Sequence, residues 1–192
     1  MHAPVLVTAP AETVLSVDEV KAHLRLDDTD QDSLLAILIA AATAHLDGWS
    51  GILGRCLIEQ TWRQNFDEFA QCLRLPLLAL AISSVKVQAS DGTIATVAAS
   101  NYTLQQDEVG SFVRFKDDYD YPSDLYQTKA IAVEFTAGYG AAAAVPANAK
   151  MAMLLLVAHW FENREAVNIG NITSTLPFAV DALLAPLRRI GI

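Results

Sequence analysis

The sequence predicts an α+β protein, in which N-terminal and C-terminal helices form a small bundle with an antiparallel β insert between them. Apolar residues recur every three or four positions over about 17–49 and about 147–188, which is typical of helices. Between these stretches, over about 57–136, the segments are short, rich in β-branched and aromatic residues, and separated by turn residues. The sequence contains no internal repeat, and we expect a single domain over residues 1–192.

A capping box marks the start of the first helix. In Ser16-Val-Asp-Glu19 the serine oxygen can accept from the amide of Glu19, whose side chain can reach back, so a short helix is expected at about 17–26. Thr29 or Asp30 caps a longer helix over about 31–47, which three glycines end. Two apolar stripes along this helix predict burial over most of its girth. They are Leu34, Leu38, Ala41 and His45, and Leu35, Ile39, Ala42, Leu46 and Trp49.

The β insert is predicted from a change of period. Residues such as Val85, Val87 and Ala89 alternate with polar ones, as they do in half-buried strands. Asp91-Gly92 is typical of a two-residue hairpin turn, and residues 107–110 indicate a second turn. The expected strands cover 57–66, 72–76, 83–90, 93–98, 101–106, 111–116 and 130–135.

The C-terminal part predicts two more helices. The helix over about 147–163 follows Pro146 and is apolar nearly all round, so we expect it to be central. Residues 165–176 show no period, and loops of this length are usually functional or ordered by a partner. A last helix is expected over about 177–188, with Pro186 weakening its end.

Composition excludes several classes of protein. The chain is 53% hydrophobic and carries a net charge of −9, so it can build a sizeable core and it repels phosphate backbones. Cys56 and Cys72 lie in no zinc-binding pattern. The first residues do not resemble a signal peptide, and the longest apolar run, 151–158, is far shorter than the ~20 residues that span a bilayer. We therefore expect a soluble, cytoplasmic protein without a membrane partner.

The segment VAHWFENREAV is the strongest candidate for a catalytic cluster. His159 and Glu162 can share a helix face, and His45 could approach them if the helices pack. A metal site needs a further ligand, however, and the charges begin where an apolar helix would end in solvent. The acidic segment 116–124 lacks the spacing of a calcium loop, although Tyr119, Tyr121 and Tyr126 could make it a contact surface. We therefore predict no catalytic residue, no metal and no cofactor.

Four stretches, taken in order, resemble the head–tail connector (adaptor) proteins of tailed bacteriophages and gene transfer agents. The closest is AIAVEFTAGYGAAAAVPANAKMAMLLLVAHWFENRE, in which a strand, Gly-Tyr-Gly, Val-Pro, an apolar helix and Asn-Arg-Glu follow one another. The others are LSVDEVKAHLRLDDTDQDSLLAILIAAATAHLDGWSG, the pair LIEQTWRQNFDEF and LRLPLLALAISSVKVQASDG, and LPFAVDALLAPLRRI. Each motif is weak alone, and their order over nearly the whole chain makes the match specific. The alanine-rich GAAAAVPANAK departs from the usual pattern.

The resemblance implies a structural role at the head–tail junction of a virion that assembles in the bacterial cytoplasm. Subunits of this family form a ring, typically dodecameric, beneath the portal protein. The ring extends the DNA channel, which DNA passes without specific binding, and it docks a stopper or another tail-side neck protein. A head-to-tail ring uses two different patches on each subunit, which would cover excess apolar surface.

Candidate intermolecular contacts lie in the aperiodic segments, because isoleucines there need burial somewhere. They are Ile169, Ile172, Leu187, Arg188, Arg189, Ile190 and Ile192, together with Tyr119 and Tyr121. Packing of the loop and tail on the subunit's own helices is the alternative. Two other functions remain open at this point: a small enzyme with a site near His159 and Glu162, and another neck component such as a stopper or tail-completion protein.

Overall fold

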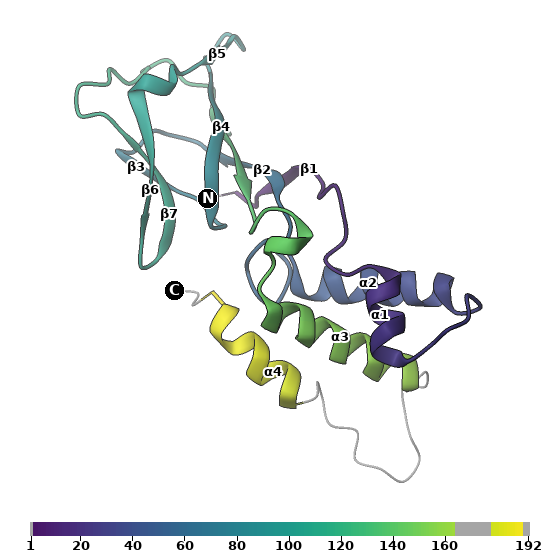
Figure 1. Ribbon diagram of the computed structural model, residues 1–192. Coiled ribbons are helices and arrows are strands. Elements are labelled where there is room, and N and C mark those ends of the chain that lie inside the picture. Colours follow the sequence, from purple (N-terminus) through teal and green to yellow (C-terminus); the bar gives the residue numbers. More distant parts are fainter. Residues whose placement is uncertain (1, 164–177, 190–192) are drawn as a thin grey trace. The chain divides into compact units, whose positions relative to one another are not determined.

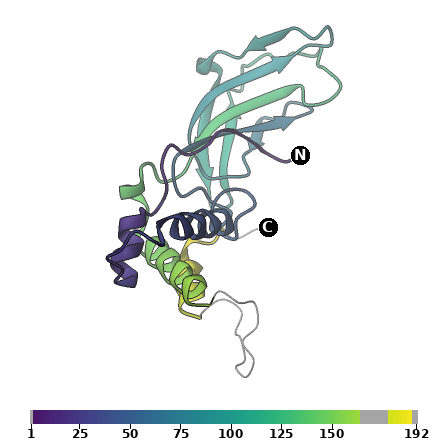
Figure 2. The same cartoon turned by 90° about the vertical axis from the view of Figure 1, so that its right-hand side faces the viewer.

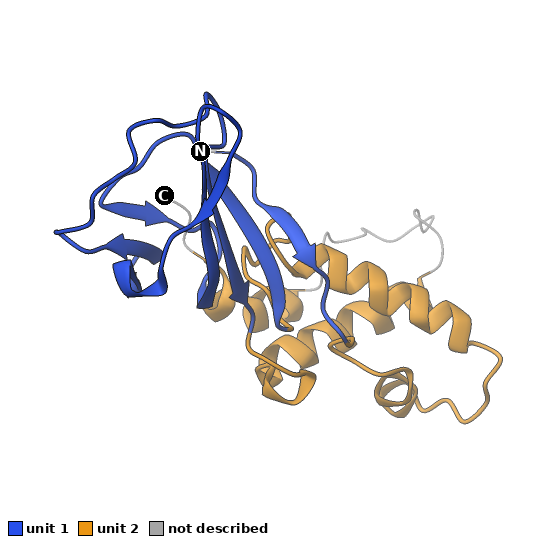
Figure 3. Cartoon of the chain, turned by 90° about the horizontal axis from the view of Figure 1, so that it is seen from above, with its two compact units in different colours: residues 1–11, 59–138, 190–192 blue, residues 12–58, 139–189 orange. Residues whose placement is uncertain are grey.

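The computed structural model describes residues 2–163 and 178–189 and confirms the α+β class (Figure 1). The chain divides into two compact units (Figure 3). The β unit comprises the described residues of 1–11 and 59–138, and the helical unit those of 12–58 and 139–189. The β unit is thus inserted between helices, close to the predicted bounds of 57–136. That residues 1–192 act as one domain stays a prediction.

The helical unit contains four α-helices among its described residues. They are α1 (Val17–Leu24), α2 (Asp32–Leu46), α3 (Ala147–Glu162) and α4 (Phe178–Leu184), which continues as the 3₁₀ turn Ala185–Leu187. The capping box forms as predicted: the Glu19 amide donates to the Ser16 hydroxyl oxygen at 3.1 Å, and the Glu19 carboxylate accepts from the Ser16 amide at 2.7 Å. These bonds fix where α1 begins.

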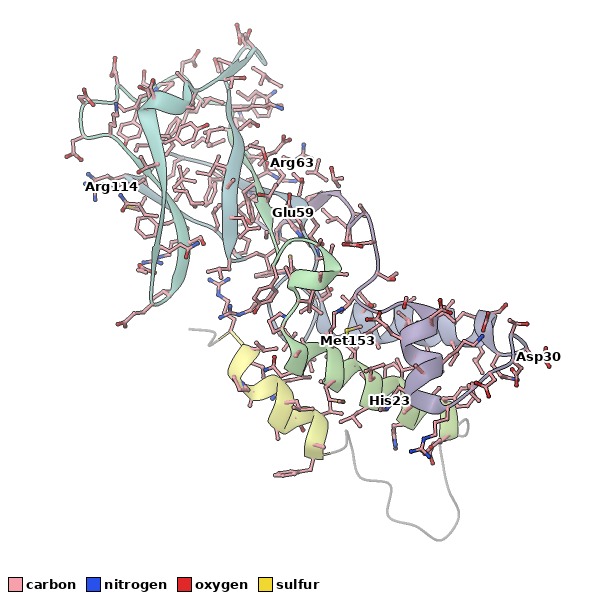
Figure 4. All side chains as sticks on the ribbon, viewed as in Figure 1. His23, Asp30, Glu59, Arg63, Arg114 and Met153 are labelled. Carbon is pink, nitrogen blue, oxygen red and sulfur yellow. The ribbon has the colours of Figure 1, made fainter. Side chains whose placement is uncertain are left out.

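Helix α3 is central in the helical unit, as its apolar sequence predicts. It packs against α1, α2 and α4 (Figure 1). Its inward residues are Ala149, Ala152, Met153, Leu156 and Val157, all with 1% exposure or less. Met153 lies among the side chains of this core in Figure 4. The rest of the core comes from α1, α2, α4 and the segments beside them: Val14, Leu15, Val20, Leu35, Ile39, Ala42, Leu46, Leu53, Leu57, Ile58, Val145, Val180 and Leu184.

The predicted burial of α2 over most of its girth is wrong. Only the stripe of Leu35, Ile39, Ala42 and Leu46 is fully buried. Ile37 is 66% exposed, and Trp49, beyond the end of the helix, is 49% exposed. The physical reason is that the helical neighbours of α2 within the helical unit, α1 and α3, lie to one side, so Leu38 is only partly buried and the positions around Ile37 stay exposed.

The β unit contains two antiparallel sheets (Figure 2). The five-stranded sheet has the order β1-β2-β8-β4-β5, and the three-stranded sheet the order β3-β7-β6. The strands are β1 (Val5–Thr8), β2 (Gln60–Phe66), β3 (Cys72–Arg74), β4 (Ala79–Gln88), β5 (Ile94–Thr96), β6 (Tyr102–Asp107), β7 (Gly110–Phe115) and β8 (Ile131–Ala137). Gln60 at the start of β2 pairs with Ala137 at the end of β8, so the insert begins and ends at neighbouring points.

The two sheets are joined at Ala79. Its amide donates to the Ser111 hydroxyl oxygen on β7 at 2.9 Å, and its carbonyl accepts from the Gln106 side chain on β6 at 3.0 Å. Trp62, Val133 and Phe135 of the larger sheet point to the buried face. The opposite face is charged: Glu134 lies 3.8 Å from both Arg63 and Lys86, and Arg63 is labelled in Figure 4.

Three details of the insert differ from the prediction. The strand β1 was not predicted, and β4 begins at Ala79 and not at residue 83. The hairpin after β4 has a three-residue loop. The Ala89 amide donates to the Thr93 carbonyl, and Gly92 takes φ +87°, a conformation that favours glycine. The Asp91 carboxylate accepts from the Thr93 amide two residues further on at 2.8 Å, a bond that aspartate often makes in turns.

The predicted turn at 107–110 joins β6 to β7, and Asp107 organises it. Its carboxylate accepts from the amides of Val109 and Gly110, both at 3.0 Å, and pairs with the Arg74 guanidinium at 2.6 Å. Arg74 also lies 5.4 Å from the centre of the Phe112 ring. The hydrogen bond from Arg74 is the main reason that the pKa of Asp107 falls from 3.8 to about 2.

We expect Arg74→Ala to raise the pKa of Asp107 towards 3.8, while the two amide donors keep it below that value. Since the pKa is lowered in the folded chain, the carboxylate's contribution to stability is full above about pH 4 and is lost as the pH falls towards 2. A carboxyl ¹³C NMR titration measures this pKa. Arg114→Ala is the matched control, because Arg114 pairs with Asp117. A pKa of Asp107 that does not move in Arg74→Ala would contradict the assignment.

Candidate assembly surfaces

The residues around His159 form the solvent-exposed C-terminal turn of α3, whose earlier turns are buried. His159 and Glu162 are exposed on the last turn of α3. The Asn163 side chain donates to the His159 carbonyl at 2.9 Å and lies 3.3 Å from its Nδ1 atom. His45 of α2 contacts α3 through Trp160, the ring centres being 6.4 Å apart. Among the described residues, no group of three or more His, Cys, Asp or Glu side chains could hold a metal ion.

Tyr119 and Tyr121 belong to an aromatic cluster inside the β unit. The Tyr119 ring stacks on Phe115 with centres 5.4 Å apart, and the Tyr121 ring lies 5.1 Å from Phe69. Desolvation by burial raises the pKa of Tyr119. The cluster therefore anchors the acidic segment 116–124 to the sheets. That the two tyrosines also contact another subunit stays a prediction, as does a contact role for Tyr126, which is 42% exposed.

An open hollow lies beside this cluster. It has a volume of about 430 Å³ and is lined by Phe69, Ala70, Gln71, Asp117 and Tyr121. Asp117 is already engaged by the Gln71 amide at 2.7 Å and by Arg114 at 3.2 Å. Figure 4 labels Arg114 on β7. Few polar groups converge here without a partner, so the hollow has none of the arrangement that catalysis or cofactor binding needs.

The described beginning of the C-terminal tail packs on the chain's own helical unit. Leu187 is half-buried, the Arg188 guanidinium pairs with Asp181 at 2.6 Å, and the Arg189 amide donates to the Leu53 carbonyl at 3.0 Å. For these three residues the intramolecular alternative has direct contacts in its favour. Ile169, Ile172, Ile190 and Ile192 lie outside the described residues.

Other exposed apolar residues were not predicted as contact sites. Helix α2 exposes Ile37 and carries only two ionisable side chains, Asp32 and His45. Helix α4 begins with Phe178, which is 88% exposed. In the β unit, Val5, Leu6 and Val7 of the edge strand β1 are each 43–45% exposed. The signal that could have identified the exposed side of α2 was its lack of charge. The apolar periodicity instead predicted burial within the chain.

The acidic break between α1 and α2 is a solvated segment. Asp27, Asp28 and Asp30 are exposed, and Asp30 is labelled at this turn in Figure 4. Asp32, at the start of α2, pairs with Lys21 at 3.0 Å. Among the described residues, no helix is long and apolar enough to cross a membrane.

The fold is similar to that of proteins solved within gene transfer agent (GTA) particles. One comes from the neck of an empty GTA particle computed with C6 symmetry, with a TM-score of 0.80. A second comes from the virion of a native GTA particle (TM-score 0.76), and a third from the neck of a native GTA particle computed with C12 symmetry (0.73). Each is 24% identical in sequence, and the alignments cover 100% of this chain and 97% of the other. At this identity the similarity shows the fold alone.

No curated relative matches the sequence at a significant level. The family model described as "Head completion protein", in contrast, matches residues 13–175, which include helices α1, α2 and α3 and every strand except β1, while α4 lies beyond the match. A match of this extent shows the family. The chain belongs to the head completion proteins, and it is a structural protein of a phage-like particle and not an enzyme.

Proposed function

We propose that the chain is the head–tail connector (adaptor) subunit of a tailed phage or gene transfer agent. Copies form a ring, a dodecamer, beneath the portal protein, extend the DNA channel and dock a stopper or another tail-side neck protein. The observation that carries the proposal is the family match over residues 13–175, together with a fold that solved necks share over the full chain. The C6 and C12 symmetry of those necks supports a ring of many copies.

The surface properties fit passage of DNA without binding. A net charge of −9 repels the phosphate backbone, and an acidic channel wall would not retain the moving duplex. The exposed aspartates of the turn between α1 and α2 and of the segment 116–124 supply such charge. Assembly takes place in the bacterial cytoplasm, and the finished ring resides in the virion.

Deletion of the gene in particle-producing cells tests the proposal. We expect DNA-filled heads and separate tails, and complementation with the full chain should restore joined particles in which cryo-electron microscopy finds twelve copies below the portal. Joined particles at the normal yield without the chain would refute the connector role. A density for the chain on the tail side of the stopper would assign it to another neck position.

Removal of residues 188–192 tests the predicted contact with the portal. We expect binding of the purified chain to the portal to weaken at least about tenfold. Asp181→Asn in the full chain is the control and should leave binding unchanged, since it breaks the exposed pair with Arg188 from a position outside the removed residues. Binding that is unchanged by the deletion would show that the tail serves its own subunit alone.

A further inference from the structure

Three helices of the helical unit pack against α3, and two of them, α2 and α4, bear on the assembly of copies. The central helix α3 packs against α2 and against α4, and it lies between them in the view of Figure 1. Each flanking helix therefore turns one side to α3 and keeps another side free of helical neighbours among the described residues. The side chains on these two outer sides indicate whether each side faces solvent or another protein surface.

The outer side of α2 is uncharged along the whole helix. A helix that faces water usually carries charged or polar residues there. In α2 the exposed positions are instead Ser33, Ala36, Ile37, Ala40, Ala41 and Ala44. The single acid, Asp32, stands at the first position and pairs with Lys21. The chain has 22 acidic and 13 basic residues, yet none of them lies among these six exposed positions. We call these six positions the α2 face.

The outer side of α4 has the same character, with one large side chain, Phe178, and three alanines. Phe178 is 88% exposed, and a benzyl side chain so exposed loses the stabilisation of burial. Ala179, Ala182 and Ala185 are exposed after it, and we call these four residues the α4 face. The one acid on α4, Asp181, is engaged by Arg188 at 2.6 Å.

We propose that the α2 face of one copy packs against the α4 face of the next copy, and that this contact closes the ring. The alanines of both faces let two helices approach closely, with Ile37 and Phe178 as the large side chains between them. The two faces differ and lie on different helices, so their pairing is heterologous, and a heterologous contact repeats into a ring when the rotation closes. The occupant of each face is a second copy of this chain. This inference rests on the proposed function, which requires many copies around one axis.

Cysteine cross-linking in assembled particles tests the contact. In a Cys72→Ser chain, which retains only the buried Cys56, Ala40→Cys and Ala182→Cys are introduced together and singly. A thiol cross-linker matched to the ~8–10 Å between packed helices then joins neighbours. The chain with both cysteines should give a ladder from dimer upwards, and either single variant should stay monomeric on a denaturing gel. A dimer from Ala40→Cys alone would show α2-to-α2 pairing and overturn the proposal.

Charge on either face should block the contact. Ile37→Glu and Phe178→Glu, each in the chain with both cysteines, should reduce the ladder at least about tenfold. Ala143→Glu, at an exposed position of the segment before α3, is the control and should leave it unchanged. Both face positions are exposed, so unchanged melting temperatures of the purified variants show that folding is intact. A full ladder in both variants overturns the proposal.

Failure of the proposed function and failure of this contact give different experimental results. If the wild-type chain is missing from the neck of purified particles, the proposed function is wrong and this contact falls with it. If the wild-type chain is present at full copy number but the chain with both cysteines gives no ladder, the contact alone is wrong.

Discussion

Replacement of Phe115 by alanine is expected to lower the free energy of unfolding of the chain by about 3–5 kcal/mol. Phe115 is fully buried, and four aromatic rings surround it. Their centres lie 5.3 Å (Phe69), 6.2 Å (Tyr102), 5.4 Å (Tyr119) and 5.8 Å (Tyr121) away. Removal of this ring leaves a cavity and takes from the 116–124 segment the surface on which it packs, because Tyr119 and Tyr121 both touch it.

Urea denaturation followed by far-ultraviolet circular dichroism measures the loss. The near-ultraviolet signal should fall as well, since the tyrosines lose their fixed environment. Phe178→Ala is the control: it removes the same side chain from an exposed position and should change stability by less than about 0.5 kcal/mol. Equal effects of the two substitutions would contradict the cluster.

Gly51→Ala is expected to destabilise the chain by about 3 kcal/mol. A Cβ atom at Gly51 would meet the backbone of the last turn of α2: the Asp47 oxygen, the Leu46 carbonyl carbon and the Leu46 oxygen. This backbone cannot move freely. The Ile52 amide donates to the His45 carbonyl at 3.0 Å, and the Leu57 amide donates to the Asp47 carboxylate at 2.5 Å.

Gly92→Ala is the control that separates this steric clash from the conformational strain of replacing a glycine that has positive φ. Gly92 has φ +87° and open space around its Cα, so alanine there meets conformational strain of about 1–2 kcal/mol and no clash. We expect the midpoint of urea unfolding to fall clearly further for Gly51→Ala than for Gly92→Ala. The reverse order would show that the turn after α2 can rearrange.

The helices could be predicted from the sequence because their signals are local. The capping box of Ser16 and Glu19 forms as expected, and the helix after Pro146 begins at Ala147. The last helix begins at Phe178 and tightens into a 3₁₀ turn where Pro186 interrupts it. In each case the residues that decide the structure lie within one turn of one another.

The strands at the sheet edge needed information that the local sequence lacks. Val5–Thr8 is a short apolar run between prolines, and it is a strand because Leu6 lies opposite Trp62, far along the chain. Similarly, Tyr119 and Tyr121 suggested a contact surface by composition, whereas Phe69 and Phe115 receive them only after the sheets assemble.

That the chain leaves apolar surface exposed could be predicted, but not where this surface lies, and its role in contacts stays a prediction. Excess apolar residues indicated contacts between subunits, and the family match supports a protein that works in an assembly. The periodicity of α2 nevertheless predicted burial within the chain, because an apolar side has the same pattern whether its own fold or another subunit covers it. The exposure of Ile37 in the structure shows that the subunit's own fold does not bury this side.

The pairing of Gln60 with Ala137 bears on the order of folding during synthesis. Residues 47–146 separate α2 from α3, and closing so long a flexible loop opposes helix docking by about 4 kcal/mol of chain entropy. Once β2 and β8 have paired, Gln60 and Ala137 lie side by side, and the chain segments that lead to α2 and α3 are close together. A nascent chain on the ribosome would therefore complete its β unit first, and α3 would then dock onto α2 with most of that entropic barrier removed.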